Sequence, residues 1–249
     1  MTYVSEVDTA ARYARYRPYV HPLIVDHISA VTDHVRCALD VGCGTGQSAR
    51  ALLRIANEVA GVDISAAMLS HAPHDARLSF SVAHAESLPF DADCFDLLTT
   101  GLAFHWFDQP AFLSEARRVL KPGGWLAIYN DGFTGIMADH PAYLDWHESQ
   151  YFARFPNPPR NLKAGGEGQW ASAGFGSRVW EKFDHDVVLT LDEWAGYLAT
   201  QSNVIARIET GEETVETVAA WLKENGAPFF KDAPRSFRFY CVLDIYQVE

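Results

Sequence analysis

One short segment constrains the fold of this chain more than any other: residues 39–47, which read LDVGCGTGQ. Gly42, Gly44 and Gly46 alternate directly after an apolar run, a pattern typical of a buried strand that turns tightly into a helix. Glycine adopts positive φ and lets a ligand approach the main chain, because it has no Cβ. A tight turn without a ligand would explain one or two glycines, so three favour a loop that a ligand approaches closely.

Two common nucleotide-binding loops do not fit this spacing. A dinucleotide-binding fingerprint needs its third glycine at position 47, where this chain has glutamine. A phosphate-binding P-loop closes with a lysine, and Gln47 and Ser48 supply none. The sequence therefore argues against a pyrophosphate site and against a P-loop.

Strand and helix patterns alternate along the first half of the chain. The predicted strands cover 35–41, 58–64, 78–82, 95–101 and 125–129, and helical spacing separates them at 47–56, around Met68 and at 112–120. Ser65 and Asp108 are predicted N-caps of two of these helices. This alternation predicts parallel βαβ units, with helices on both faces of one sheet.

The second half has a different composition. Residues 131–178 are rich in glycine, proline and aromatic residues, and the part 156–168 is predicted to be a loop. Two long strands are predicted at 178–190 and 235–248, with helices near 192–201 and 212–225 between them. Two strands joined by so long a connection can pair antiparallel at the edge of the sheet.

Charge and cysteine usage exclude several classes of protein. The 249 residues carry 20 Lys and Arg against 32 Asp and Glu, a net charge of −12, so nucleic acid and anionic membranes are not expected partners. The four cysteines lack paired or metal-ligand spacing and are expected to be reduced thiols in the cytoplasm; they are Cys37, Cys43, Cys94 and Cys241. No export signal, membrane anchor or metal-binding carboxylate cluster is expected, and the oligomeric state is left open.

Asp63 ends the second predicted strand, at the edge where open α/β sheets bind their ligands. A carboxylate there can accept hydrogen bonds from both hydroxyls of a ribose. The alternative is a solvated turn residue or a helix cap. A ribose site without a pyrophosphate site indicates an adenosyl ligand other than a dinucleotide.

At this point the sequence resembles the class I S-adenosylmethionine-dependent methyltransferases. Five motifs over about residues 35–130 carry the resemblance: LDVGCGTGQSAR, VAGVDIS, AESLPF, FDLLTTGLAFHWFD and EARRVLKPGGWLAIY. It implies a Rossmann-like, seven-stranded, mostly parallel α/β sheet with helices on both faces and the last strand antiparallel, together with a helical and loop lid.

The resemblance also implies a set of cofactor-binding residues. Asp40 and the backbone of Gly42, Gly44 and Gly46 would hold the methionine part of S-adenosylmethionine. The remaining candidates are Asp63 for the ribose, Ile64 and Met68 against the adenine, Ala85 and Glu86 at the adenine edge, and Thr100. Many relatives have aspartate before the Ala-Glu pair, where this chain has His84.

Three shorter motifs are similar to the trans-aconitate-type branch of these enzymes: YARYRP at 13–18, AFHWFD at 103–108 and GYLATQS at 196–202. In that branch the N-terminal segment covers the cofactor, which would bring Tyr13 and Arg17 to the pocket. Relatives often continue with Tyr-Pro, where this chain has Val20 and His21. The implied division is a cap at 1–34, a cofactor-binding core at 35–130, a substrate lid with connecting helices at 131–178 and 191–234, and edge strands at 179–190 and 235–249.

Methyl transfer from a sulfonium is an in-line displacement, so the protein supplies alignment and dryness. A general base is needed only when the acceptor starts protonated. His105, directly after the fourth strand, is the candidate base, and a structural histidine is the alternative. Trp106, Tyr16 and His147 are candidate substrate contacts, and Arg17 would clamp an acid if it faces the pocket.

The favoured function is methyl transfer to a small molecule, with O-methylation of a carboxylate or a hydroxyl preferred. N- or C-methylation is an alternative, as is a protein that binds the cofactor without catalysis. A methyltransferase acting on RNA or protein would need a basic groove or an open site, which nothing in the sequence supplies.

Overall fold

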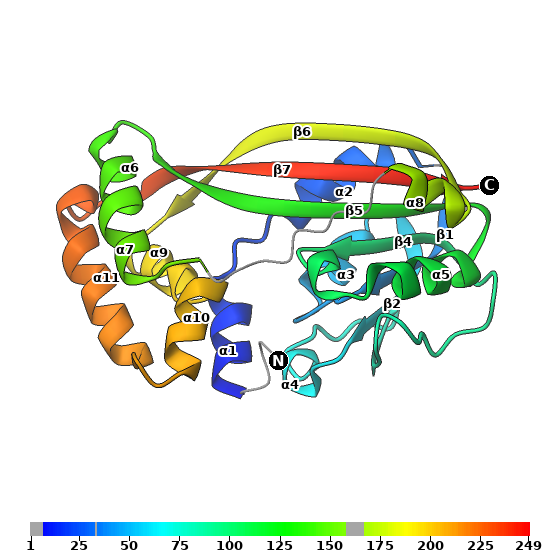
Figure 1. Ribbon diagram of the computed structural model, residues 1–249, viewed down its shortest axis with the longest axis horizontal. Helices are drawn as coiled ribbons and strands as arrows, with labels where there is room; N and C mark the ends of the chain where they lie inside the picture. Colours follow the sequence, from blue (N-terminus) through cyan, green and yellow to red (C-terminus); the bar gives the residue numbers. More distant parts are fainter. Residues whose placement is uncertain (1–6, 33, 158–166) are drawn as a thin grey trace. The chain divides into compact units, whose positions relative to one another are not determined.

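Seven strands form one sheet in the order β3-β2-β1-β4-β5-β7-β6. The computed structural model describes residues 7–32, 34–157 and 167–249 (Figure 1). The strands are β1 (Val35–Val41), β2 (Ala56–Asp63), β3 (Leu78–Val82), β4 (Phe95–Gly101), β5 (Leu120–Met137), β6 (Phe175–Leu189) and β7 (Arg235–Val248). This order places β1 and β4 at the centre, so their carboxyl ends lie at the switch point of the sheet, where open α/β sheets bind ligands.

The first five strands are parallel and the last one is antiparallel. Parallel pairing joins β1 to β2 and β4, β2 to β3, and β4 to β5. Strand β7 runs antiparallel to β5. The Thr134 hydroxyl donates to the Arg238 carbonyl, and four residues later the Ala138 N–H donates to the carbonyl of Ser236, which precedes Arg238 in the chain. The predicted sheet, with its antiparallel last strand, is confirmed.

The chain divides into two compact units. We call the first the helical unit, which takes in Met1–Pro18, Gly132–Arg160 and Phe183–Tyr240. The second, the sheet unit, takes in Tyr19–Asp131, Asn161–Lys182 and Cys241–Glu249. Because β5, β6 and β7 are long, each of these strands contributes residues to both units.

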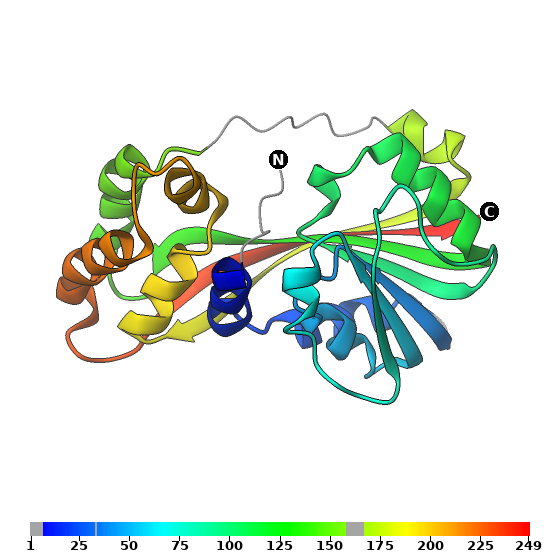
Figure 2. The same ribbon diagram turned by 90° about the horizontal axis from the view of Figure 1, so that it is seen from below.

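The sheet unit has helices on both faces of its strands (Figure 2). The helices α2 (His21–Ser29) and α3 (Gln47–Leu52) cover one face, and α5 (Gln109–Val119) and α8 (Glu167–Ser172) cover the other. Alternate strand residues point to each face. The face under α5 buries a continuous apolar cluster that includes Leu39, Val41, Leu98, Phe112, Leu113, Leu126 and Ile128.

The helical unit is built on an aromatic core. It contains α1 (Val7–Tyr16), α6 (Ala142–Trp146), a π-helical turn (His147–Tyr151), α7 (Phe152–Arg154), α9 (Leu191–Leu198), α10 (Ser202–Glu209) and α11 (Val215–Phe230). Buried members of the core include Tyr143, Trp146, Tyr151, Phe155, Trp194, Phe230 and Phe237. Trp194 Nε1 donates to the Tyr143 hydroxyl at 2.7 Å, which satisfies the polar atoms of two buried rings. The aromatic patch predicted between 143 and 155 is therefore largely core.

Several boundaries differ from the sequence prediction. The fifth strand was predicted to end at 129, but β5 continues to Met137, because β7 pairs with it along the added length. The helix predicted at 47–56 ends at Leu52, and β2 begins at Ala56. Most of the loop predicted at 156–168 lies outside the described residues.

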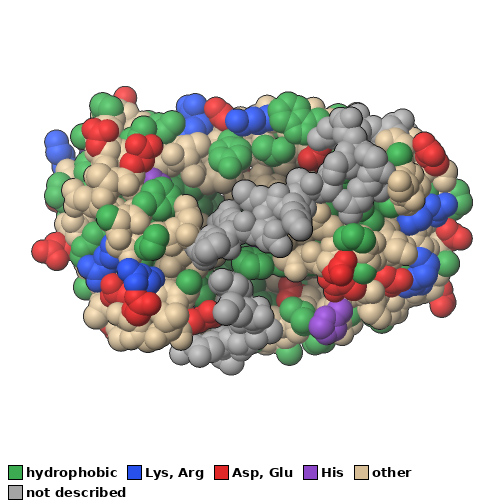
Figure 3. Space-filling model, in the orientation of Figure 1, with side chains coloured by type: hydrophobic (Ala, Val, Ile, Leu, Met, Phe, Trp, Pro, Cys, Tyr) green, Lys and Arg blue, Asp and Glu red, His purple; other side chains and the backbone are tan. Residues whose placement is uncertain are grey.

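The surface carries charges of both signs. Figure 3 shows acidic and basic side chains interspersed over the described part of one face, so the acidic excess is spread rather than gathered there. Within the described ranges, none of the helices has the length and apolar character needed to cross a bilayer.

Candidate cofactor and active site

The glycine loop follows β1 with an unusual backbone. Gly42, Gly44 and Gly46 have φ values of +71°, +54° and +72°, which side-chain-bearing residues rarely adopt. Gly46 is also the N-cap of α3. All three glycines are therefore required by the backbone conformation of the loop itself.

Packing separates the roles of these glycines. A Cβ on Gly42 would lie 2.6 Å from the Ala103 Cβ, and one on Gly46 would lie 2.9 Å from the Phe80 ring. The space at these two positions is filled by the protein. At Gly44 the nearest atom is the Met68 Cε, at 3.1 Å, the end of a flexible side chain. Gly44 is thus the position where a ligand can approach the backbone most easily.

Asp40, near the end of β1, connects the segments around the glycine loop through side-chain hydrogen bonds. Its buried carboxylate accepts hydrogen bonds from the hydroxyls of Ser48, in α3, and Thr99, in β4, the latter at 2.9 Å. Burial raises the pKa of Asp40 to about 6. The carboxylate therefore ties β1, α3 and β4 together, and its contact with a methionine moiety stays a prediction.

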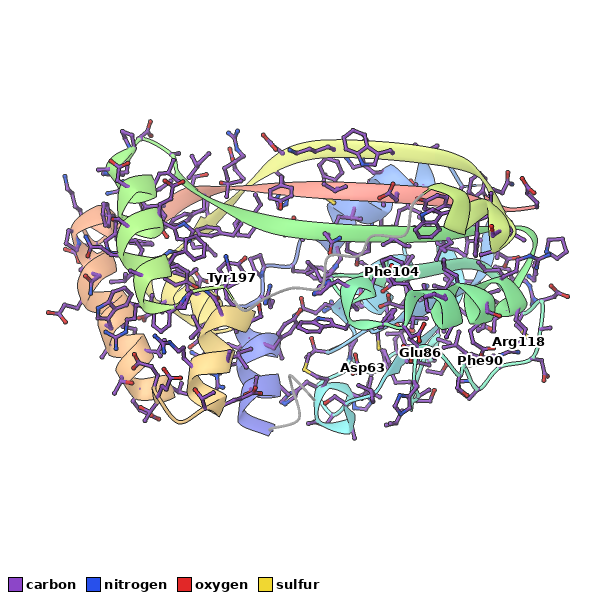
Figure 4. All side chains as sticks on the ribbon, viewed as in Figure 1. Asp63, Glu86, Phe90, Phe104, Arg118 and Tyr197 are labelled. Atoms are coloured by element: carbon purple, nitrogen blue, oxygen red, sulfur yellow. The ribbon has the colours of Figure 1, made fainter. Side chains whose placement is uncertain are left out.

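Asp63 lies at the carboxyl end of β2 and holds the loop from the side (Figure 4). Its carboxylate accepts hydrogen bonds from the backbone N–H groups of Gly44 and Ser65, both at 2.8 Å. Burial raises the pKa of Asp63 above its ordinary value. The Ile64 N–H is a third backbone donor to Asp63. An ionised carboxylate has about four acceptor positions, so capacity remains for a further donor such as a ribose hydroxyl. The residues present fit an adenosyl ligand.

The adenine candidates follow β2 and β3. Ile64 is 51% exposed, whereas Met68 is buried in α4 (Ala66–Leu69), whose N-cap is the hydroxyl of Ser65 as predicted. Ala85 is buried. Glu86 accepts a hydrogen bond from the Asp108 N–H at 2.8 Å and so fastens this segment to the start of α5. An exposed apolar side chain beside Asp63 suits the face of a flat ring.

Thr100, on β4, has a buried hydroxyl without a hydrogen-bond partner in the described chain. Its neighbour Thr99 points to the opposite face and bonds Asp40. A buried hydroxyl that makes no hydrogen bond costs about 1–3 kcal/mol. In the described part of the sheet unit, few buried side-chain polar atoms lack a partner in this way.

His105 and Trp106 lie on a single 3₁₀ turn (Phe104–Trp106) directly after β4. Both side chains are exposed, and their rings lie 4.8 Å apart. Phe107, in contrast, packs beside Gly42 and against Phe112 in the core. The turn thus presents an imidazole and an indole at the carboxyl end of the central strands, whereas the partly buried Phe107 that follows it packs against the core.

Four predicted site residues belong to the helical unit. Arg17 donates from Nη2 to the Thr200 carbonyl at 2.9 Å and lies over the rings of Tyr13 and Tyr197. Tyr16 packs against Gly196. The structure therefore does not group these side chains with the glycine loop and Asp63, and their part in one site stays a prediction.

His147, the fourth of these residues, is buried in the π-helical turn. Its ring stacks between the rings of Tyr143 and Tyr151, at centroid distances of 6.1 and 4.9 Å. Burial lowers its pKa to about 4, so the imidazole is neutral at physiological pH. These contacts are those of a core histidine, and its role toward a substrate is untested.

The sequence analysis did not predict two sets of polar contacts near the carboxyl ends of the central strands, those of Asp40 and that of His21 with Tyr129. Ser48 and Thr99 hold Asp40, and a polar residue among the buried residues of β4 was the available signal. His21 Nδ1 lies 3.0 Å from the Tyr129 hydroxyl. No sequence signal joins His21 to Tyr129, because the two residues meet only through the packing of α2 on β5. Within the described ranges, no group of three or more His, Cys, Asp or Glu could hold a metal ion.

Comparison with known proteins agrees with this geometry. Residues 39–128 match the methyltransferase domain family. A candidate methyltransferase of Dictyostelium discoideum is 24% identical over 207 residues, which is 82% of this chain and 78% of that protein. A malonyl-[acyl-carrier protein] O-methyltransferase of Salmonella typhimurium is 40% identical over 92 residues, but the match covers only 36% of this chain and 37% of that protein.

Solved structures support the fold. A candidate type II methyltransferase from Anaeromyxobacter dehalogenans superposes with a TM-score of 0.70 at 24% identity, over 92% of this chain and 95% of that one. The family match over residues 39–128, taken together with this fold, identifies that segment as a methyltransferase domain of the class I, S-adenosylmethionine-dependent type. The predicted class and cofactor are confirmed, and the likeness to the trans-aconitate-type branch stays a prediction.

Proposed function

We propose that this protein transfers a methyl group from S-adenosylmethionine to an oxygen of a small-molecule acceptor, a carboxylate or a hydroxyl. The observation that carries the proposal is the Asp63 carboxylate, which holds the Gly44 backbone and keeps acceptor capacity at the ligand-binding edge of the sheet. The similarity to enzymes named as malonyl-[acyl-carrier protein] O-methyltransferases favours oxygen as the acceptor atom.

Different residues of the sheet unit would bind different parts of the cofactor. Asp63 would bind the ribose, and the backbone at Gly44 would border the methionine portion. The other proposed contacts are Asp40, Gly42, Gly46 and Thr100 toward the methionine side, and Ile64, Met68, Ala85 and Glu86 around the adenine. The bound cofactor supplies a methyl group on a sulfonium, whose leaving group is a neutral thioether.

His105 and Trp106, on the turn after β4, are the residues proposed to contact the methyl acceptor. As the sequence predicts, we assign residues 1–34 to a cap that includes Tyr13 and Arg17, and 131–178 with 191–234 to a lid that includes His147. Tyr16 is a further proposed substrate contact. The net charge of −12 favours a small-molecule acceptor over nucleic acid, and four free thiols are in keeping with a reducing cytoplasm.

Asp63→Ala tests the cofactor assignment directly. Calorimetric titration with S-adenosylmethionine and S-adenosylhomocysteine should give micromolar affinity for the native chain and an affinity at least tenfold weaker for the variant. Asp75→Ala is the matched control, because that exposed carboxylate bonds Arg77 just before the start of β3. Equal affinity of the Asp63 variant and the native chain would exclude the ribose role.

Turnover then separates the enzyme from the alternatives. Transfer of labelled methyl to an acid, alcohol or phenol supports the O-methyltransferase, and transfer only to an amine or carbon favours the N- or C-methylation alternative. Tight cofactor binding without transfer to any of these acceptors would indicate a protein that binds S-adenosylmethionine without catalysis.

A further inference from the structure

A phenol–imidazole pair lies at the carboxyl end of the central strands, outside the set of residues assigned above. Tyr129, on β5, is 4% exposed and pairs in register with Gly101, the last residue of β4. A Cβ on Gly101 would lie 2.3 Å from the Tyr129 Cζ and 2.4 Å from its hydroxyl oxygen. The hydroxyl therefore lies directly over the end of β4, where the chain has no side chain to displace it.

This position is next to the glycine loop. Ala103, two residues after Gly101, fills the space at Gly42, and His105 follows on the same turn. The Leu102 N–H donates to the Tyr129 carbonyl at 2.9 Å, which fixes β5 against this turn. The hydroxyl of Tyr129 is thus held at the edge of the sheet where the methyl donor and its acceptor would meet.

His21, the first residue of α2, stands behind the hydroxyl. Its Nδ1 lies 3.0 Å from the Tyr129 oxygen, and its ring meets the rings of Tyr19 and Tyr129 edge-on. Burial lowers the pKa of His21 to about 4, so the ring is neutral at physiological pH and one ring nitrogen is an acceptor. A neutral imidazole bonded to a phenol can take the phenol proton as the phenol receives another.

We propose that Tyr129 and His21 accept the proton released when a hydroxyl-bearing acceptor is methylated, with Tyr129 touching the acceptor and His21 positioned behind it. The acceptor oxygen gains the methyl carbon and gives its proton to the Tyr129 oxygen, while the Tyr129 proton passes to His21 Nδ1. The imidazolium then gives one proton to water and returns to the neutral tautomer with its proton on Nε2. This inference rests on the proposed function and narrows its acceptor from carboxylate or hydroxyl to hydroxyl.

The matched variants are His21→Asn and Tyr129→Phe. An asparagine amide oxygen can replace Nδ1 as the acceptor for the phenol, so His21→Asn keeps the structural hydrogen bond but cannot take a proton. Both variants should keep the native affinity for S-adenosylhomocysteine and the native melting temperature within about 3 °C. If the native chain does not bind S-adenosylhomocysteine, that result counts against the proposed function and not against the Tyr129–His21 pair.

Labelled-methyl assays should pair each hydroxyl acceptor with the acid of the same skeleton, such as 4-methylphenol with 4-methylbenzoate. We expect methylation of hydroxyl acceptors, with kcat at least about 100-fold lower in His21→Asn and Tyr129→Phe and KM little changed. Full kcat in His21→Asn would make the pair purely structural and overturn the inference. Methylation by the native chain of acids alone would overturn it as well.

The tautomer of His21 gives a test that needs no acceptor. Nitrogen-15 NMR of the histidine rings, assigned with His21→Asn, should show Nδ1 unprotonated and the proton on Nε2 between about pH 6 and 8. A proton on Nδ1 would mean that the imidazole donates to the phenol oxygen, and this result alone would overturn the relay. An unprotonated Nδ1 upholds it.

Discussion

At the residue scale, neighbouring residues of β4 differ in what their hydroxyls do. Thr99 donates to the Asp40 carboxylate at 2.9 Å, whereas the buried hydroxyl of Thr100 makes no hydrogen bond in the described chain. The two residues share type, strand and burial. This pair therefore separates a buried hydroxyl that stabilises the free protein from one that has no hydrogen-bond partner in the described chain.

Thr99→Val should lower the free energy of unfolding by about 1.5–3 kcal/mol, because it removes a hydrogen bond to a buried carboxylate. Thr100→Val should leave the stability unchanged or raise it, since it removes an unsatisfied buried hydroxyl of similar volume. Urea unfolding of both variants measures the difference. Equal destabilisation by the two substitutions would show that Thr100 has a partner in the free protein.

Asp40 gives a pH dependence of known sign. Its pKa rises from 3.8 to about 6 on folding, so the native state binds the proton more tightly than the unfolded state. The stability that this group contributes is fully present below about pH 4 and is lost as the pH rises to about 6, by about 3 kcal/mol. The lowered pKa values of His21 and His147 act oppositely in this window, because those rings must be neutral to remain buried.

The contribution of Asp40 is therefore measured as the difference in unfolding free energy between the native chain and Asp40→Asn, because the same histidines titrate in both proteins. Unfolding free energies at intervals from pH 4 to 7 should show the native chain losing stability relative to the variant by about 3 kcal/mol. A constant difference across this range would contradict the raised pKa.

At the scale of elements, the helical unit depends on close approach of α9 and α11. Gly226, inside α11, is buried, and a Cβ there would lie 2.4 Å from the Trp194 ring and 2.9 Å from Leu191. Trp194 cannot move freely, because its Nε1 bonds the Tyr143 hydroxyl. This glycine is thus a packing requirement that helix propensity alone would not select.

Gly226→Ala should destabilise the protein by about 1–3 kcal/mol, because overpacking against Trp194 exceeds the gain of up to about 1 kcal/mol in helix propensity. Glu224→Ala, an exposed change in the same helix, should stay within about 0.5 kcal/mol of the native chain. Thermal unfolding compares the two. A more stable Gly226 variant would show that the Trp194 ring has room to shift.

At the scale of the whole molecule, the chain enters each of its two units more than once. The strands β5, β6 and β7 carry the chain from one unit into the other, so the two cores share continuous strands. The sheet unit contains the glycine loop, Asp40, Asp63 and the His21–Tyr129 pair. Most of the proposed cofactor-binding residues therefore lie in one unit, although they come from segments that are dispersed along the sequence.

The sequence by itself determined the parallel βαβ core and the strand-to-helix loop, because these depend on local signals, and its resemblance to the class I methyltransferases implied the full sheet and the cofactor. Apolar periodicity located β1, β3, β4 and β7 with their observed bounds, and the Ser65 and Asp108 caps depend on residues three positions apart. Only the tertiary structure decided the extension of β5, the ties of Asp40 to Ser48 and Thr99, and the meeting of His21 with Tyr129. These features arise from contacts between segments far apart in the chain, and no periodicity or spacing in one sequence encodes them.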